Sequence, residues 1–285
     1  MSNKRNIKIF GIMFLVLLVV VSFWLYSELD YGKLKVYFLD VGQGDSILIK
    51  TPSNHQILID GGPDNKVIQR LSKHMMFFDR TIDMVVLTHP EKDHISGLID
   101  VLKRYKVNTI LETGMNCETF ECNEWENIKK QKNIQSMYAQ IGEKFDFGDG
   151  AEINILHPFE SIHNVELKDK NLGSIVIKLI YGNTSMLFTG DIEQLVEKKL
   201  LSAGLDISAD VLKIAHHGSK TSSSEDFLKL VDPIFSFIEV GQNNRYGHPS
   251  SEVLLRLQEI GTQILRTDEK GDVTVECSKS RCFID

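Results

Sequence analysis

Apolar segments of this chain repeatedly end in a side chain that can bind a metal ion. Their length and apolar character are typical of buried strands. Strand ends that meet at one edge of a sheet bring their side chains into a single site. The segments are ILID before Gly61, VVLT before His89, MLFTG before Asp191, LKIA before His216, and SFIEVGQ ahead of His248. The sequence therefore predicts an α/β fold with one composite site at a sheet edge.

The 285 residues have a globular composition, with 42% hydrophobic and 25% charged residues. No linker or repeat divides the chain after its N-terminal segment, so we expect one domain over residues 31–285. Within that domain, the patterns predict a helix over residues 96–105 and little regular structure over residues 106–150. They also predict a closing hairpin over residues 263–276.

A run without charge, residues 9–26, precedes that domain. As a helix, a run of this length spans about 27 Å, close to the thickness of a bilayer core. Basic residues come before the run and acidic residues follow it, so the positive-inside rule keeps the N-terminus in the cytoplasm. We therefore expect residues 1–30 to form one transmembrane signal anchor in the cell membrane, with an extracytoplasmic domain. A cleaved signal peptide is the alternative, although the residues after the run lack the small side chains that cleavage requires.

The four cysteines form two pairs, Cys117 with Cys122 and Cys277 with Cys282, each with four residues between its members. In an oxidising compartment, each pair can close a small local disulfide loop. Pairing between the two loops is an alternative. A structural zinc site is another, which the lack of a Cys-x-x-Cys knuckle disfavours.

The charge of the chain limits its partners. The formal net charge is −7, and because residues 1–30 contribute +1, residues 31–285 carry −8. An acidic domain gains no long-range attraction to a polyanion, so a nucleic acid must be held by metal ions and a few local cations. Phe77 and Phe78 are interpreted as packing residues rather than a base-stacking platform, because no basic stripe accompanies them.

The densest group of metal-binding side chains lies in residues 89–97, HPEKDHISG. This loop between a buried strand and a helix offers two imidazoles and two carboxylates within six residues. It can present His89 and Glu91 to one cation, and Asp93 and His94 to a second. A solvated loop is the alternative interpretation.

Two further segments extend this group. Asp191 can bridge two cations about 3.5–4 Å apart, or it can cap the helix that follows it. His216 and His217 are adjacent at a strand end and are expected to point in opposite directions. One can then bind a metal while the other faces the substrate or a supporting group. A pair of surface histidines is the alternative.

Together these segments resemble the metallo-β-lactamase superfamily, and most closely the hydrolase domain of the ComEC competence DNA-uptake proteins. The resemblance covers about residues 35 to 275, in the order of the family and without its multi-span channel. The segments that carry it are LDVGQGDSILI (39–49), LIDGG (58–62), LTHPEKDHISG (87–97), NLGSIVIKL (171–179), LFTGDIE (187–193), LKIAHHGSKTSSSEDFL (212–228), NNRYGHPS (243–250) and RTDEKGDV (266–273). It implies a four-layer αββα sandwich that holds two divalent metal ions.

The resemblance also implies the site residues. The metal positions of the family fall on His89, Glu91, Asp93, His94 and Asp191, with His216 or His217 as a further ligand and His248 as a candidate for the last one. Asp60 matches an acid that supports the loop of residues 89–97, here called the metal loop. Asp45 is expected to organise the Gly-Gln-Gly turn at residues 42–44. Classical lactamases have a histidine at the position of Glu91. They have a third histidine roughly at the position of Ser174. This oxygen-rich subsite suits manganese beside zinc and disfavours β-lactam hydrolysis.

The leading functional hypothesis is a binuclear phosphodiesterase or nuclease, and the resemblance implies single-stranded DNA as its substrate. Two cations would activate water and neutralise phosphoryl charge. Asp191 would bridge the two cations, and Asp93 would be a further metal ligand and catalytic residue. His217, Lys213 or Lys220 would contact the phosphoryl oxygens, and His248 would protonate the leaving group. The alternatives are a smaller or cell-surface substrate, such as a phosphorylcholine ester, and a non-catalytic binding module. The sequence indicates no protein partner.

Overall fold

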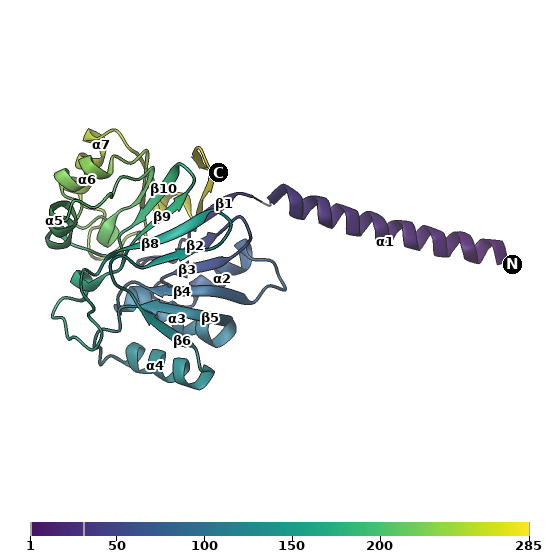
Figure 1. Ribbon diagram of the computed structural model, residues 1–285, viewed down its shortest axis with the longest axis horizontal. Coiled ribbons are helices and arrows are strands. Elements are labelled where there is room, and N and C mark those ends of the chain that lie inside the picture. Colours follow the sequence, from purple (N-terminus) through teal and green to yellow (C-terminus); the bar gives the residue numbers. More distant parts are fainter. Residues whose placement is uncertain (1, 31, 285) are drawn as a thin grey trace.

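The computed structural model describes residues 2–30 and 32–284, with side chains for residues 7–23 and 32–284. Its centre is a pair of stacked sheets with helices on the outer faces (Figure 1). The first sheet has the strand order β15-β14-β1-β2-β3-β4-β5-β6. Its strands are β1 Leu34–Phe38, β2 Ile47–Lys50, β3 Gln56–Ile59, β4 Thr81–Leu87, β5 Lys106–Glu112, β6 Gln135–Tyr138, β14 Val273–Cys277 and β15 Cys282–Ile284.

The second sheet has the order β13-β12-β11-β10-β9-β8-β7. Its strands are β7 Lys144–Asp146, β8 Ala151–His157, β9 Val176–Tyr181, β10 Thr184–Phe188, β11 Val211–Lys213, β12 Phe235–Ile238 and β13 Gln263–Arg266. The helices are α1 Ser2–Asp30, α2 Lys66–His74, α3 Lys92–Arg104, α4 Phe120–Lys132, α5 Gln194–Ser202, α6 Glu225–Val231, α7 Ser251–Glu259 and α8 Thr267–Lys270, with short 3-10 turns at Lys170–Gly173 and Ala215–Gly218.

Three apolar cores establish the layers. Val36 and Phe38 of β1 point into the core between the two sheets, whereas Tyr37 between them points into the core under α2, α3 and α4. This alternation is the two-residue period of a strand, with both faces buried. A third core lies between the second sheet and α5, α6 and α7. The layers are therefore helix, sheet, sheet and helix, as the sequence predicted.

Parallel strands direct the site to one rim. β3, β4 and β5 run parallel in the first sheet, and β10, β11 and β12 run parallel in the second. Side chains that follow the ends of such strands share an edge of their sheet. The predicted composite site lies at this rim.

Residues 263–276 do not form the predicted hairpin. β13 pairs with β12 in the second sheet, whereas β14 pairs with β1 in the first. The chain crosses from one sheet to the other through α8. The hairpin prediction was wrong because each strand joins a different sheet, where its apolar side chains are buried.

Two other element predictions were wrong. α3 begins at Lys92 rather than near residue 96, so Asp93 and His94 lie on its first turn. Residues 106–150 are regular rather than irregular, because they contain β5, α4, β6 and β7. The Thr119 side chain caps α4 by accepting a hydrogen bond from the backbone N–H of Cys122.

The N-terminal segment forms α1, which extends away from the two sheets (Figure 1). Across the described part of the chain, no helix has both the length and the apolar character needed to cross a bilayer. The anchor was predicted over residues 9–26, and the side chains of its last three residues, 24–26, lie outside the described part of the structure. Phe77 and Phe78 are 90% and 72% exposed, so their interpretation as packing residues is wrong.

Candidate metal centre

The rim of the sandwich collects side chains from both sheets. Asp60 follows β3 and His89 follows β4, whereas Asp191 follows β10. His217 comes from the turn after β11, and the first turn of α3 adds Asp93 and His94. Segments far apart in the sequence therefore meet where the parallel strands of the two sheets end.

The metal loop lies directly on the turn at Asp60, because two glycines allow the backbones to touch. The Gly61 N–H donates to the His94 carbonyl over 2.9 Å. A Cβ on Gly97 would lie 1.8 Å from the Gly61 carbonyl oxygen, so only glycine fits there. Asp60 itself has a φ of 55°, in the left-handed region that Asp tolerates better than most residues.

Buried polar groups fix the orientation of the first two imidazoles. Nδ1 of His94 lies 2.8 Å from the Asp60 carboxylate, and Thr88 donates to the same carboxylate through its hydroxyl over 2.7 Å. The Thr88 hydroxyl also lies 3.0 Å from Nδ1 of His89. Because Nδ1 of each ring is engaged, Nε2 is the atom left to face the centre.

His217 is held in the same way from the second sheet. Its Nδ1 donates to the Glu239 carbonyl over 2.8 Å and lies 3.2 Å from the Asp45 carboxylate. Its Nε2 lies 3.3 Å from the Asp93 carboxylate and 3.4 Å from that of Asp191. The Asp191 carboxylate also lies 3.3 Å from Nε2 of His94.

These residues fit a divalent metal ion. Nε2 of His89, His94 and His217 are all buried, and none forms a hydrogen bond within the described residues. A buried polar atom without a partner costs free energy, which a bound cation would recover. The groups whose ligand atoms lie within 4.8 Å of one another include His89 with His94 and Asp191, Asp93 with His94 and His217, and Asp45 with Asp191 and His217.

The buried carboxylates of the centre stabilise positive charge on the imidazoles beside them. Burial alone would lower the pKa of His217, but the charges of Asp191 and Asp45 raise it to about 10. Asp191 and then Asp60 likewise raise the pKa of His94 well above its usual value, against the effect of burial. His89 behaves differently, because burial and the charge of His94 lower its pKa well below the usual value.

The Lys213 ammonium group neutralises buried carboxylates of the centre instead of facing a substrate. Its ammonium group is buried, pairs with Asp45, lies 3.5 Å from Asp191, and donates to the Gly190 carbonyl over 3.0 Å. Burial alone would lower the Lys213 pKa, but Asp45 and Asp191 raise it. The predicted contact between Lys213 and a phosphoryl oxygen therefore does not fit this position, because the ammonium group faces away from solvent.

Asp45 was predicted only to organise the turn at residues 42–44, but its carboxylate also contacts Lys213 and His217 in the centre. Both Asp45 and Glu239 are buried, and one Glu239 oxygen accepts from the Ser46 N–H over 2.9 Å. Burial and the charge of Asp45 raise the Glu239 pKa well above its usual value. Glu239 was not among the predicted site residues, although an acid within the apolar segment SFIEVGQ was a usable signal.

Three predicted ligands lie at the edge of the centre, outside the close groups found among the described residues. Glu91 is half-buried at the N-cap of α3, and burial followed by the charge of Asp93 raises its pKa. The His216 ring lies 5.9 Å from the His248 ring and 6.2 Å from the His217 ring. Of the three histidines left open by the sequence, the structure brings His217 into the centre and leaves His216 and His248 at its rim.

Ser174 occupies the place where the resemblance put a missing histidine. Its hydroxyl accepts a hydrogen bond from the Asp191 N–H over 3.2 Å, and it is fully buried. Ser174 therefore positions the backbone at Asp191. His157 contacts the Ser174 carbonyl over 2.8 Å through Nδ1 and is absent from the close groups of possible ligands in the described residues.

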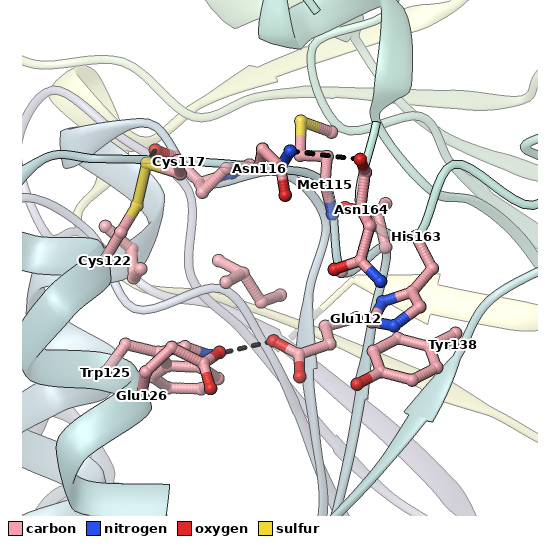
Figure 2. A pocket seen from close by; sticks show the side chains of 15 residues that line it. Glu112, Met115, Asn116, Cys117, Cys122, Trp125, Glu126, Tyr138, His163 and Asn164 are labelled. Atoms are coloured by element: carbon pink, nitrogen blue, oxygen red, sulfur yellow. Dashed lines mark hydrogen bonds between the residues drawn. A yellow bond between two sulfur atoms is a disulfide. The ribbon is translucent and has the colours of Figure 1, made fainter. Parts of the chain in front are cut away.

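The cysteines form the two local disulfides, Cys117 with Cys122 and Cys277 with Cys282. The first borders a cavity of about 220 Å³ that Pro90 and Ile95 of the metal loop also line. Figure 2 shows this disulfide at one side of the cavity and Glu112 pointing towards Trp125, whose indole N–H donates to it over 2.8 Å. The two sulfur atoms lie 3.9 and 4.0 Å from the Pro90 carbonyl oxygen.

Comparison with known proteins identifies the family. The model of the metallo-β-lactamase superfamily matches residues 39–233, which include the metal loop, Asp191 and His217. The chain belongs to the metallo-β-lactamase superfamily. It is therefore a metallohydrolase-superfamily domain with candidate metal ligands at the position where this fold binds divalent metal.

Within this superfamily, the chain is similar to competence proteins, as the sequence predicted. It is 30% identical to ComE operon protein 3 of Bacillus subtilis over 262 residues, which cover 84% of this chain and 32% of that protein. It is also 30% identical to the competence protein ComA of Neisseria gonorrhoeae over 237 residues, covering 81% and 30%. The chain thus spans about a third of the length of these relatives.

The metallo-β-lactamase fold also has matches among solved structures. Igni18, a metallo hydrolase from the archaeon Ignicoccus hospitalis, superposes with a TM-score of 0.57 at 15% sequence identity. The match covers 85% of this chain and 98% of Igni18. At this identity the likeness concerns the fold, and it agrees with the two sheets and their outer helices.

Proposed function

We propose that this domain is a binuclear metal-dependent phosphodiesterase that cleaves single-stranded DNA. The observation that carries the proposal is the convergence of Asp93, Asp191, His94 and His217 at one rim, with imidazole Nε2 atoms left without hydrogen bonds. The similarity to competence proteins, together with the sequence resemblance to the ComEC competence DNA-uptake proteins, supports DNA as the substrate.

The ligand set supports two cations. His89, His94 and Asp191 form one close group. Because Nε2 of His94 can bind only one cation, Asp93 and His217, whose carboxylate oxygen and Nε2 lie 3.3 Å apart, would hold the second. Asp191 lies between the two sets of ligands, since its carboxylate approaches both His94 and His217. Zinc suits the imidazoles, and manganese suits the carboxylates. Divalent cations held here supply Lewis acidity and neutralise phosphoryl charge during hydrolysis.

The reaction breaks one P–O ester bond. A water oxygen forms the new bond to phosphorus, and the leaving oxygen takes up a proton. His248 is a candidate donor of that proton, because it is half-buried at the rim beside His216. Burial and the nearby His216 lower the pKa of His248, which makes its protonated form a stronger acid.

Three substrates test the proposal. The purified chain, loaded with Zn²⁺ or Mn²⁺, is offered single-stranded DNA, bis-p-nitrophenyl phosphate and a phosphorylcholine ester. We expect cleavage of the DNA and of the small diester. Asp191→Ala should lose bound metal and turnover together, whereas Asp226→Ala, an exposed acid on α6, should retain both. Full turnover by Asp191→Ala would refute the metal centre.

A phosphorylcholine ester is the second candidate substrate. The net charge of −8 on residues 31–285 favours a substrate with less negative charge than DNA. Cleavage of the small esters without DNA would select this candidate. Bound metal without any turnover would instead support the third hypothesis, a non-catalytic binding module.

We further propose that α1 anchors the domain in the cell membrane, with residues 31–285 outside the cytoplasm. Residues 9–26 carry no charge, and the basic residues lie on their N-terminal side. The large apolar side chains described on α1 are 41–74% exposed. Protease added to intact spheroplasts should digest the domain and leave α1 in the membrane fraction after carbonate washing. A domain protected from the protease contradicts the proposed orientation, and a domain released by the carbonate wash contradicts the anchor.

A further inference from the structure

An exposed aromatic side chain lies beside the candidate metal centre. The loop of residues 241–248 follows β12 and carries Tyr246, which is 54% exposed. Its ring lies 5.8 Å from the His248 ring at an interplanar angle of 14°. His248 in turn lies 5.9 Å from His216, which adjoins His217 in the centre. A series of rings therefore leads from the metal ligands to Tyr246.

A cation accompanies this ring. The guanidinium carbon of Arg245 lies 4.9 Å from the centroid of the Tyr246 ring, and Nη2 donates to the tyrosine hydroxyl over 2.8 Å. The hydrogen bond to Tyr246 and, less strongly, the charge of Asp93 raise the Arg245 pKa. Arg245 thus places a positive charge beside the exposed ring, in a domain whose net charge is −8.

The loop that carries both side chains is fixed by one asparagine. The Asn244 amide donates to the carbonyls of Gly241 and His248 over 3.0 and 2.6 Å. Its oxygen accepts from the N–H groups of Tyr246 and His248 over 3.2 and 3.0 Å. The Gly241 N–H also donates to the Gln43 side chain, which ties the loop to the first sheet. Tyr246 is therefore exposed on an ordered support, not on a loose loop.

From this arrangement we propose that Tyr246 and Arg245 form a nucleobase-binding subsite for the strand that the metal centre cleaves. An exposed aromatic ring stacks on any base, and an adjacent arginine pairs with the flanking phosphate. The guanidinium group already over the ring disfavours the quaternary ammonium of a choline ester, because two cations repel. The subsite rests on the proposed phosphodiesterase function and names its substrate class.

Comparing KM for base-bearing and abasic strands distinguishes stacking of a base on Tyr246 from electrostatic binding of phosphates by Arg245. The probes are single strands of about 12 nucleotides, one with bases and one abasic, assayed with the metal-loaded full chain. Tyr246→Ala should raise KM for the base-bearing strand about ten-fold and change KM for the abasic strand much less. Tyr246→Phe should restore most of the lost affinity. Arg245→Gln should raise KM for both strands and reduce the salt dependence.

The chain offers a matched control. Arg281 lies 4.5 Å from the ring of Phe283, which is 47% exposed, so the two pairs have similar chemistry. Phe283 is on β15, whose partner strand pairs Cys277 with Leu34 at the start of β1, away from the rim. Phe283→Ala should therefore leave KM unchanged for both strands.

The outcomes distinguish the two proposals. Wild-type cleavage of DNA with equal KM in Tyr246→Ala and Tyr246→Phe overturns the subsite alone. A loss that is equal on abasic and base-bearing strands also overturns it, because stacking requires bases. Wild-type cleavage of bis-p-nitrophenyl phosphate but of neither strand overturns the nuclease proposal and the subsite with it.

Discussion

The Asp60 carboxylate and Nδ1 of His94 are 2.8 Å apart, and both side chains are inaccessible to solvent. Asp60 thereby sets the direction in which the imidazole presents Nε2. Supporting acids of this kind change metal affinity about 10–100-fold when they are removed. The pair connects a strand end of the first sheet with the first turn of α3.

Asp60→Asn should weaken metal binding by about ten-fold or more. Asparagine keeps the size of the side chain and tolerates the positive φ at this position, but it removes the negative charge. Competition with a chromophoric chelator measures the change. Asp272→Asn is the matched control, since Asp272 lies 3.0 Å from Nε2 of His74 outside the centre. Equal affinity in both variants would contradict the supporting role of Asp60.

The buried pair of Lys213 and Asp45 predicts a second effect. Lys213→Met removes the ammonium group that pairs with Asp45, leaves imidazoles such as that of His217 beside that charge, and should lower the free energy of unfolding by about 3–5 kcal/mol. Adding Asp45→Asn should recover part of that loss, because the buried carboxylate that has lost its ammonium partner is then neutral. Urea denaturation of the metal-free variants tests this coupling. Strict additivity of the two substitutions would show that the pair does not interact.

The local part of the site could be predicted from the sequence. His89, Asp93 and His94 lie within six residues, so their proximity needs no knowledge of the fold. Asp191 and His217 were found because each follows an apolar strand. The long-range contacts were not found: Asp45 pairs with Lys213, 168 positions away along the chain, and no local pattern encodes that meeting.

The backbone at the histidine pair explains another difference. His216 and His217 were expected at the end of a strand, but β11 ends at Lys213 and they lie in a 3-10 turn. Their φ angles are 51° and 52°, in the left-handed region. Such angles place His217 inward and His216 at the rim, and the sequence pattern does not reveal left-handed backbone at non-glycine residues.

The first disulfide should support the metal loop. Cys117 and Cys122 both contact the carbonyl of Pro90, which lies between the predicted ligands His89 and Glu91. Cys117→Ser with Cys122→Ser should free the loop to move into the adjacent cavity. We expect metal affinity to fall several-fold, towards the ten-fold typical of supporting groups.

The second disulfide provides the control for this prediction. Cys277 and Cys282 join β14 to β15, and Cys277 pairs with Leu34 at the start of β1, away from the metal loop. The corresponding double serine variant should lower thermal stability without changing metal affinity. Equal affinity losses in the two double variants would contradict a specific role for the first disulfide.

His157 predicts an acid-sensitive step in stability. It is buried, and burial lowers its pKa from 6.5 to about 4 despite the hydrogen bond to the Ser174 carbonyl. Above pH 6.5 the ring is neutral in both folded and unfolded chains. Between pH 6.5 and 4 the unfolded chain binds a proton that the folded chain does not, so the free energy of unfolding falls as pH falls.

The expected loss from this one group is about 3 kcal/mol between pH 7 and 4, since each unit of pKa difference is worth about 1.4 kcal/mol. His157→Asn removes the titration, while its amide can still donate to the Ser174 carbonyl. Other groups titrate in both proteins, so the comparison is the difference between their urea-unfolding free energies at pH 7 and pH 4, with the metal removed. The wild type should lose more stability than the variant over this interval, and parallel losses would mean that His157 titrates normally in the folded chain.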